Sequence, residues 1–137
     1  SSDLPEGGFV LRDDSSTPAV FLAKGTGFAP IKSLVEQAIT IDNSEALRLI
    51  QVGGNPPGSV LDNLCRSWSD CLDNFVYCAP AEDCSATELV QLLLQATAGL
   101  HRFDLYIAGP REWLAAVTAE AGPKGFDTAS WYCQAAG

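Results

Sequence analysis

Two short segments of this 137-residue chain combine glycine and proline in a way that suits the binding of an anion. In the first, Lys24-Gly25-Thr26-Gly27 follows an apolar run, and Pro30 opens the amphipathic segment that comes next. Glycine permits a tight turn and a close approach to a ligand, and proline is tolerated in the first turn of a helix. Free amides, the helix dipole and the Thr26 hydroxyl could together bind a pyrophosphate. The same glycines could also serve only to make a tight strand-to-helix turn.

The second segment, Gly109-Pro110, repeats this design at the end of a later apolar run. Two such glycine-proline segments in one chain favour a ligand-binding role more strongly than one segment does. The loop at residues 53–58, GGNPPG, is also rich in glycine and proline, which indicates a shaped edge rather than a flexible connection. These three segments are the main candidates for a ligand site.

Side chains able to perform acid–base, nucleophilic or metal chemistry are not grouped in the sequence. Four of the five cysteines are separated by five, six and five residues, without the close pairs typical of zinc or iron–sulfur sites. These four are Cys65, Cys71, Cys78 and Cys84. We expect structural, reduced thiols, which fit a cytoplasmic location because no secretory signal is present. His101 is expected at the surface, and we predict no catalytic residue and no metal site.

The charge of the chain argues against two classes of partner. A net charge of −9 and a pI near 4.3 disfavour nucleic acid and anionic membranes. No apolar run approaches the roughly 20 residues that span a bilayer. We therefore expect neither nucleic acid nor membrane as a partner.

The candidate loops need a framework, and the sequence predicts one in which strands and helices alternate. The continuous apolar run at residues 18–23 predicts a strand buried on both faces, and the segments 47–52, 74–79 and 104–109 predict three more strands, with a weaker strand at 129–133 and a short one at 8–12. Helices are predicted from Pro30, after Ser59, after Ser85 in a capping box with Glu88, and from Pro110. This alternation predicts a Rossmann-like α/β fold, a three-layer α/β/α sandwich with about five parallel strands.

The inward faces of the helices follow from their apolar spacing. They are Ile31, Leu34, Val35 and Ala38 in the first helix, Val60, Leu61, Leu64 and Trp68 in the second, and Trp113, Leu114 and Val117 in the last. Ligands of open parallel sheets bind beyond the carboxyl ends of the strands. The expected site is therefore formed by the loops at residues 24–30, 53–58, 79–84 and 109–113.

The strings GTGFAP, QVGG and YIAGP, in this order, resemble the nicotinamide-nucleotide-binding half of the ferredoxin reductase-like flavoprotein family. KGTGFAP, from Lys24 to Pro30, is similar to the family's G-G-T-G-x-x-P loop, and the residues from Ala108 to Arg111 are similar to its C-G-P-P segment. GGFVLR, which includes residues 8–12, resembles the last strand of the preceding flavin domain. The resemblance extends from about Gly8 to Tyr132.

This resemblance implies strand order 3-2-1-4-5 and an NAD(P)-binding domain at residues 1–137, with residues 1–14 the end of a preceding flavin-binding domain. It implies that NAD(P)H is positioned for hydride transfer to FAD or FMN on a neighbouring domain outside this chain. Electrons would then pass to an iron–sulfur domain or protein, or to an oxygenase. The cofactor-binding residues would be Gly25, Thr26, Gly27, Pro30, Gly53, Gly54, Asn55, Ala108, Gly109 and Pro110.

Two departures from the family pattern leave an alternative open. Lys24 replaces a glycine, so its charge either points at a phosphate or flavin or projects to solvent, which we prefer. Ala108 replaces a frequent cysteine. A non-catalytic nucleotide-binding or regulatory domain with the same fold is therefore the alternative function.

The sequence also bears on the choice of nucleotide. NADPH selection normally needs a basic residue near the adenosine ribose, and the loop after the second strand has none, so NADH is preferred. Asn55 or Asp62 could accept from the ribose hydroxyls, whereas Arg66, Arg102 or Arg111 could still reach the site.

Three aromatic residues near the end of the chain could shield a flavin or pack on the sheet, and packing is preferred. They are Phe126, Trp131 and Tyr132.

Overall fold

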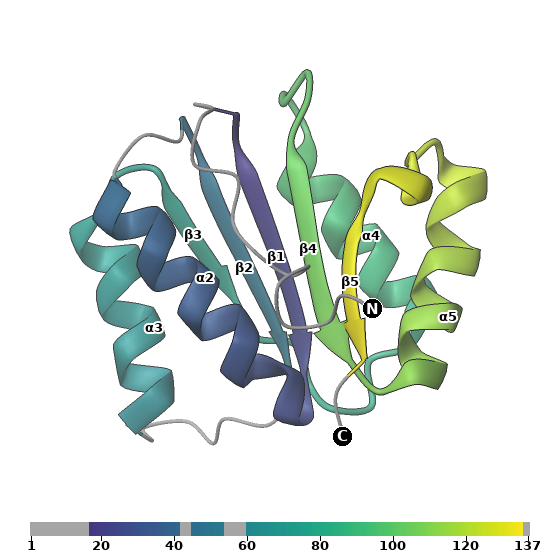
Figure 1. The fold of residues 1–137 in the computed structure, drawn as a ribbon, viewed down its shortest axis with the longest axis horizontal. Helices are drawn as coiled ribbons and strands as arrows, with labels where there is room; N and C mark the ends of the chain where they lie inside the picture. Colours follow the sequence, from purple (N-terminus) through teal and green to yellow (C-terminus); the bar gives the residue numbers. More distant parts are fainter. Residues whose placement is uncertain (1–16, 42–44, 54–59, 136–137) are drawn as a thin grey trace, which may run out of the picture.

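The computed structural model describes residues 17–41, 45–53 and 60–135. These residues form a five-stranded parallel sheet of order β3-β2-β1-β4-β5 between two layers of helices (Figure 1). The elements are β1 (Ala19–Lys24), η1 (Gly25–Gly27), α2 (Phe28–Ile41), β2 (Leu47–Val52), α3 (Val60–Cys71), β3 (Phe75–Cys78), α4 (Ala86–Thr97), β4 (Asp104–Gly109), α5 (Arg111–Ala121), η2 (Gly122–Lys124), η3 (Thr128–Ser130) and β5 (Tyr132–Ala135). The predicted sandwich and strand order are confirmed, and the predicted strand at 8–12 lies outside the described residues.

The central strands are apolar because both of their faces are covered. One face packs against α2 and α3 through Phe21, Ala23 and Leu49, and the other packs against α4 and α5 through Val20 and Leu22. Side chains alternate between the faces of a strand, so a continuous apolar run requires two apolar layers. The sheet thus holds its strand ends, and the loops that follow them, in fixed positions.

Three helix starts agree with the signals in the sequence, whereas α2 begins at Phe28, two residues before the predicted Pro30. The Ser85 side chain accepts from the Glu88 amide at 3.1 Å, and the Glu88 carboxylate accepts from the Ser85 amide at 3.0 Å, which confirms the predicted capping box. Pro110 caps α5, and the four apolar residues predicted to face inward from the first helix are all buried in α2.

The aromatic residues near the end of the chain pack on the sheet, as preferred from the sequence. Tyr132 stacks on Tyr106 with ring centroids 4.9 Å apart, and Tyr106 stacks on Phe21 at 5.5 Å. Trp131 is buried and contacts Phe126 edge-on at 6.0 Å. These contacts tie the edge strand β5 to the centre of the sheet.

Two local predictions are wrong. The predicted strand at 129–133 begins only at Tyr132, because residues 128–130 form a short 3-10 turn in which the Ser130 hydroxyl donates to the Asp127 carbonyl at 2.7 Å. In α3, Val60 is 83% exposed and Leu61 is also exposed, whereas Asp62 and Cys65 face the sheet. The helix is therefore rotated so that Val60 and Leu61 lie outside, although Trp68 still packs against the core as expected.

Candidate functional site

The order of the strands changes direction between β1 and β4, since β2 and β3 lie on one side of β1 and β4 and β5 on the other. In open parallel sheets, ligands bind next to such a switch, at the carboxyl ends of the strands. Both glycine-proline exits lie here, because β1 ends immediately before the GTG turn η1 and β4 ends at Gly109. The register that pairs Ala23 with Ala108 brings the two exits side by side at the lower edge of the sheet in Figure 1.

Gly27 is the point at which these two exits touch. A Cβ atom on Gly27 would lie 2.2 Å from the carbonyl oxygen of Ala108 and 2.8 Å from the amide nitrogen of Gly109. Non-bonded atoms do not approach so closely, so only glycine fits. From the sequence, this glycine was expected to let a ligand approach closely. In the structure, Gly27 instead lets the backbone of the turn approach the backbone at the end of β4. The GTG turn and the end of β4 therefore form one packed unit.

Gly25 and Thr26, in contrast, face open space. Gly25 has a φ of 61°, in the left-handed region, and nothing lies within 4 Å of the position of a Cβ atom. Thr26 is exposed, and Pro30 is half-buried in the first turn of α2. The backbone of Gly25 and the Thr26 hydroxyl can therefore reach an anion at the switch point, close to the positive end of the α2 dipole.

The exit from β2 is joined to the loop that follows β3. Gly53 has a φ of 59°, its amide donates to the Pro80 carbonyl at 3.0 Å, and a Cβ atom on it would lie 2.7 Å from Cβ of Glu82. These contacts bring the predicted loop segments 53–58 and 79–84 together through their described residues. Gly54 and Asn55, also predicted to bind the cofactor, lie outside the described residues.

Two buried polar atoms near the strand ends have no hydrogen-bond partner in the part of the chain that the structure describes. Gln51 is 1% exposed; its Nε2 donates to the Gly53 carbonyl at 3.1 Å, and its Oε1 is unpaired. Trp113 is 8% exposed, packs where a Gly109 side chain would lie, and has an unpaired Nε1. Buried polar atoms are normally paired, so these two atoms are exceptions among the described residues. Trp113 lies in the predicted site segment 109–113, whereas Gln51 was not predicted, although the glutamine within LRLIQV was an available signal.

Lys24 is half-buried at the end of β1. Strand alternation directs its side chain to the face covered by α4 and α5, where its Cβ lies 3.4 Å from the position of a Gly109 Cβ. Burial and two nearby carboxylates raise the pKa of the Cys84 thiol, whereas the positive charge of Lys24 lowers it. Lys24 therefore lies beside the β4 exit and within electrostatic range of the loop after β3.

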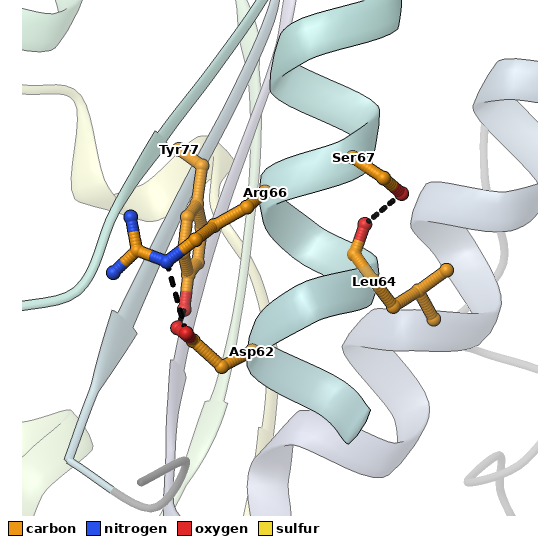
Figure 2. Close-up of polar contacts among 5 residues, drawn as sticks. All are labelled: Asp62, Leu64, Arg66, Ser67 and Tyr77. Atoms are coloured by element: carbon orange, nitrogen blue, oxygen red, sulfur yellow. Dashed lines mark hydrogen bonds and ion pairs between the residues drawn. The ribbon is translucent and has the colours of Figure 1, made fainter. Parts of the chain in front are cut away.

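The first turns of α3 carry a buried carboxylate (Figure 2). Asp62, 2% exposed, accepts from Arg66 Nε at 2.9 Å and from the Tyr77 hydroxyl at 3.3 Å, and the Arg66 guanidinium lies 5.7 Å from the Tyr77 ring centroid. Burial, followed by the charges of neighbouring groups, raises the pKa of Tyr77 to about 12 and that of Cys65 to about 11. Asp62 is thus committed to bonds within the protein.

The other arginines proposed for the nucleotide differ in position. Arg102 lies at the opposite, amino edge of the sheet, where its Nη2 donates to the Thr17 hydroxyl at 3.0 Å. Arg111 begins α5 and is exposed at the carboxyl edge. Two cavities of about 310 and 270 Å³ open at the amino edge, and both are lined by Arg102. The exits at the switch point form an open edge that is separate from these cavities.

The described residues contain no group of three or more metal-ligating side chains, and none of the helices among them is both long and apolar enough to cross a membrane. The five cysteines are free thiols, and His101 is exposed, as predicted.

Comparison with known proteins places these features in context, although no protein-family model matches the chain. The chain is 34% identical to the CDP-6-deoxy-L-threo-D-glycero-4-hexulose-3-dehydrase reductase of Yersinia pestis over 122 residues, covering 84% of this chain and 35% of the relative. It is 33% identical to terephthalate 1,2-dioxygenase reductase component 2 of Comamonas sp over 81 residues, covering 59% of this chain and 24% of the relative. The chain thus spans about a quarter to a third of the length of these relatives.

The chain is a relative of ferredoxin reductase-like flavoproteins. Its fold is similar to that of Amycolatopsis cytochrome P450 reductase GcoB, with a TM-score of 0.72, 14% identity and coverage of 96% of this chain and 42% of that one. It is also similar to the CS-b5R domains of human Ncb5or in its NAD+ form, with a TM-score of 0.70, 14% identity and coverage of 97% and 39%. The resemblance stated from GTGFAP, QVGG and YIAGP is confirmed, and this reductase-like chain has the fold expected from it.

Proposed function

We propose that this chain is the nicotinamide-nucleotide-binding module of a flavin-dependent oxidoreductase. It positions NAD(P)H against FAD or FMN on a neighbouring domain, from which electrons pass to an iron–sulfur protein or an oxygenase. The observation that carries this proposal is the backbone contact at Gly27, which joins the GTG turn and the AGP exit into one unit at the switch point. The names of the relatives, which are reductases and reductase components of an oxygenase system, support it.

The residues of this chain bind and orient the cofactor. Gly25 and Thr26 face the pyrophosphate, and Gly27 and Pro30 hold the turn that presents them. Gly53, Gly54 and Asn55 serve the adenosine side, and Ala108, Gly109 and Pro110 serve the nicotinamide side. A bound reduced nicotinamide supplies hydride transfer to the flavin. The protein contributes orientation and exclusion of water, and this reaction requires no acid–base side chain.

We also propose that NADH is preferred to NADPH. Arg66 donates to the buried Asp62, and Arg102 lies at the amino edge, so neither arginine is an uncommitted cation near the exit from β2. Two other cations at the carboxyl edge, Arg111 and Lys24, lie beside the exit from β4. A 2′-phosphate is normally recognised by such a cation. Thermal shift and calorimetric titration with NADH and NADPH test this preference, and tighter binding of NADPH would contradict it.

The domain organisation follows from the same proposal. Residues 1–14 would be the end of a flavin-binding domain on the same full-length chain, and an iron–sulfur domain or protein would be the further partner. Five free thiols and a net charge of −9 support a cytoplasmic protein without nucleic-acid or membrane partners.

A non-catalytic nucleotide-binding domain remains the second candidate, favoured by Lys24 and Ala108 at positions where the resembling family has glycine and cysteine. The two functions differ in the full-length protein. NADH-dependent bleaching of a bound flavin supports the reductase, whereas nucleotide binding without flavin reduction supports the alternative. No stabilisation of this chain by NADH, NADPH or ADP-ribose would contradict both.

A further inference from the structure

Lys24 is the residue at the switch point whose role the fold does not explain. Its Cβ lies 3.4 Å from the position of a Gly109 Cβ, an ordinary contact distance, and the Trp113 ring occupies the space that a Gly109 side chain would take. In the β1–β2 register Lys24 pairs with Val52, the residue before Gly53, to which the loop after β3 is bonded. Lys24 therefore lies between the exits of β2 and β4, at the centre of the carboxyl edge.

The ammonium group of Lys24 forms no ion pair with the residues that the structure describes. No hydrogen bond from it to these residues is present either, whereas Lys32 pairs with Glu36 at 2.8 Å. Partial burial of an unpaired cation costs free energy that a nearby anion offsets. Lys24 belongs to a chain of net charge −9, in which most charged groups would repel an anionic ligand.

We infer that Lys24 binds the pyrophosphate of the nicotinamide dinucleotide, in addition to the backbone and hydroxyl of the GTG turn. This inference rests on the proposed function and adds a residue that replaces a glycine of the resembling family. The chemistry of the ligand selects the pyrophosphate, because reduced nicotinamide, ribose and adenine are uncharged. The pyrophosphate is therefore the one anionic group of NADH that a cation at this edge of the sheet could bind.

The test is calorimetric titration of the chain and its Lys24→Met variant with NADH, ADP-ribose and adenosine. Met keeps the apolar stem and removes the charge, so the fold is retained, and an unchanged Tm checks this. We expect NADH and ADP-ribose to bind about tenfold more weakly to Lys24→Met, since a hydrogen bond to a charged group is lost. Adenosine, which lacks phosphate, should bind equally to both, and Lys24→Arg should retain most of the affinity.

The matched control is Lys124→Met, which makes the same charge change at the amino edge, where Lys124 lines the cavity of about 310 Å³. Equal weakening by Lys124→Met would show a general charge effect and overturn the inference. Unchanged or tighter binding of ADP-ribose by Lys24→Met would overturn it as well, leaving the proposed function intact. Failure of the unsubstituted chain to bind NADH or ADP-ribose would overturn the proposed function and this inference with it.

Discussion

Replacement of Gly27 by alanine tests whether the two exits at the switch point form one packed unit. The added Cβ would lie 2.2 Å from the Ala108 carbonyl oxygen, and an ordinary contact begins at 3.4 Å, so the turn and β4 must separate by about 1.2 Å. Both obstructing groups are backbone, and β4 is held between β1 and β5. We expect a loss of about 3 kcal/mol in the free energy of unfolding, at the upper end of the usual cost of overpacking.

Urea unfolding followed by circular dichroism measures this loss, and two variants separate the steric cost from the backbone cost. Gly25→Ala and Gly99→Ala place alanine at φ values of 61° and 87° with nothing within 4 Å of the new atom. Each should therefore lose about 1 kcal/mol from the left-handed conformation alone. Gly27→Ala should also weaken ADP-ribose binding, because the turn that presents Thr26 is displaced.

The packing argument would be refuted if Gly27→Ala were as stable as Gly99→Ala and bound ADP-ribose like the unsubstituted chain. That result would mean that the turn moves freely relative to β4, and that Gly27 is needed neither for packing nor for binding the ligand.

Two further predictions concern the cluster on α3. Asp62→Ala removes the acceptor for Arg66 and Tyr77 and should lower the free energy of unfolding in urea by about 2 kcal/mol, as expected for bonds to a buried charge. The control Glu36→Ala breaks the exposed pair with Lys32 and should lower it by less than about 0.5 kcal/mol. Equal losses would contradict this assignment. The pKa of Cys65 is raised from 9.0 to about 11, so the folded state holds its proton more tightly than the unfolded state. Stability should consequently fall as pH rises from 9 to 11, and Cys65→Ala should show a smaller fall when unfolding is measured at pH 8 and pH 10.5; parallel pH profiles would show that this thiol is not the source.

The framework could be predicted from the sequence because its signals are local. The strands β1, β2 and β4 are rich in apolar residues, and Ser85 and Glu88 mark the start of α4 by themselves. The rotation of α3 could not be predicted in this way. The buried Asp62 accepts from Tyr77 on β3, and that pairing depends on the packing of α3 against β3. The spacing of apolar residues, which places Val60 and Leu61 on the inner face, carries no information about the contact with Tyr77.

The site shows the same division. The positions of the GTG and AGP exits follow from strand order, which the alternation of elements and the family resemblance predict. The reason why residue 27 must be glycine does not follow from strand order, because Gly27 contacts Ala108, which is far away in the sequence. The unpaired atoms of Gln51 and Trp113 likewise become visible only once burial and hydrogen bonding are known.

The strand order also determines how this sheet meets other copies of itself. In the part of the chain that the structure describes, the outermost strands, β3 and β5, have four residues each, so each outer edge is only a short row of backbone groups. The six-residue strands β1, β2 and β4, which are the most apolar and would be the best templates for aggregation, lie inside the sheet with both edges paired. The strand order that places the candidate nucleotide-binding loops at the centre of the sheet therefore also keeps the strands most prone to aggregation from pairing with neighbouring molecules.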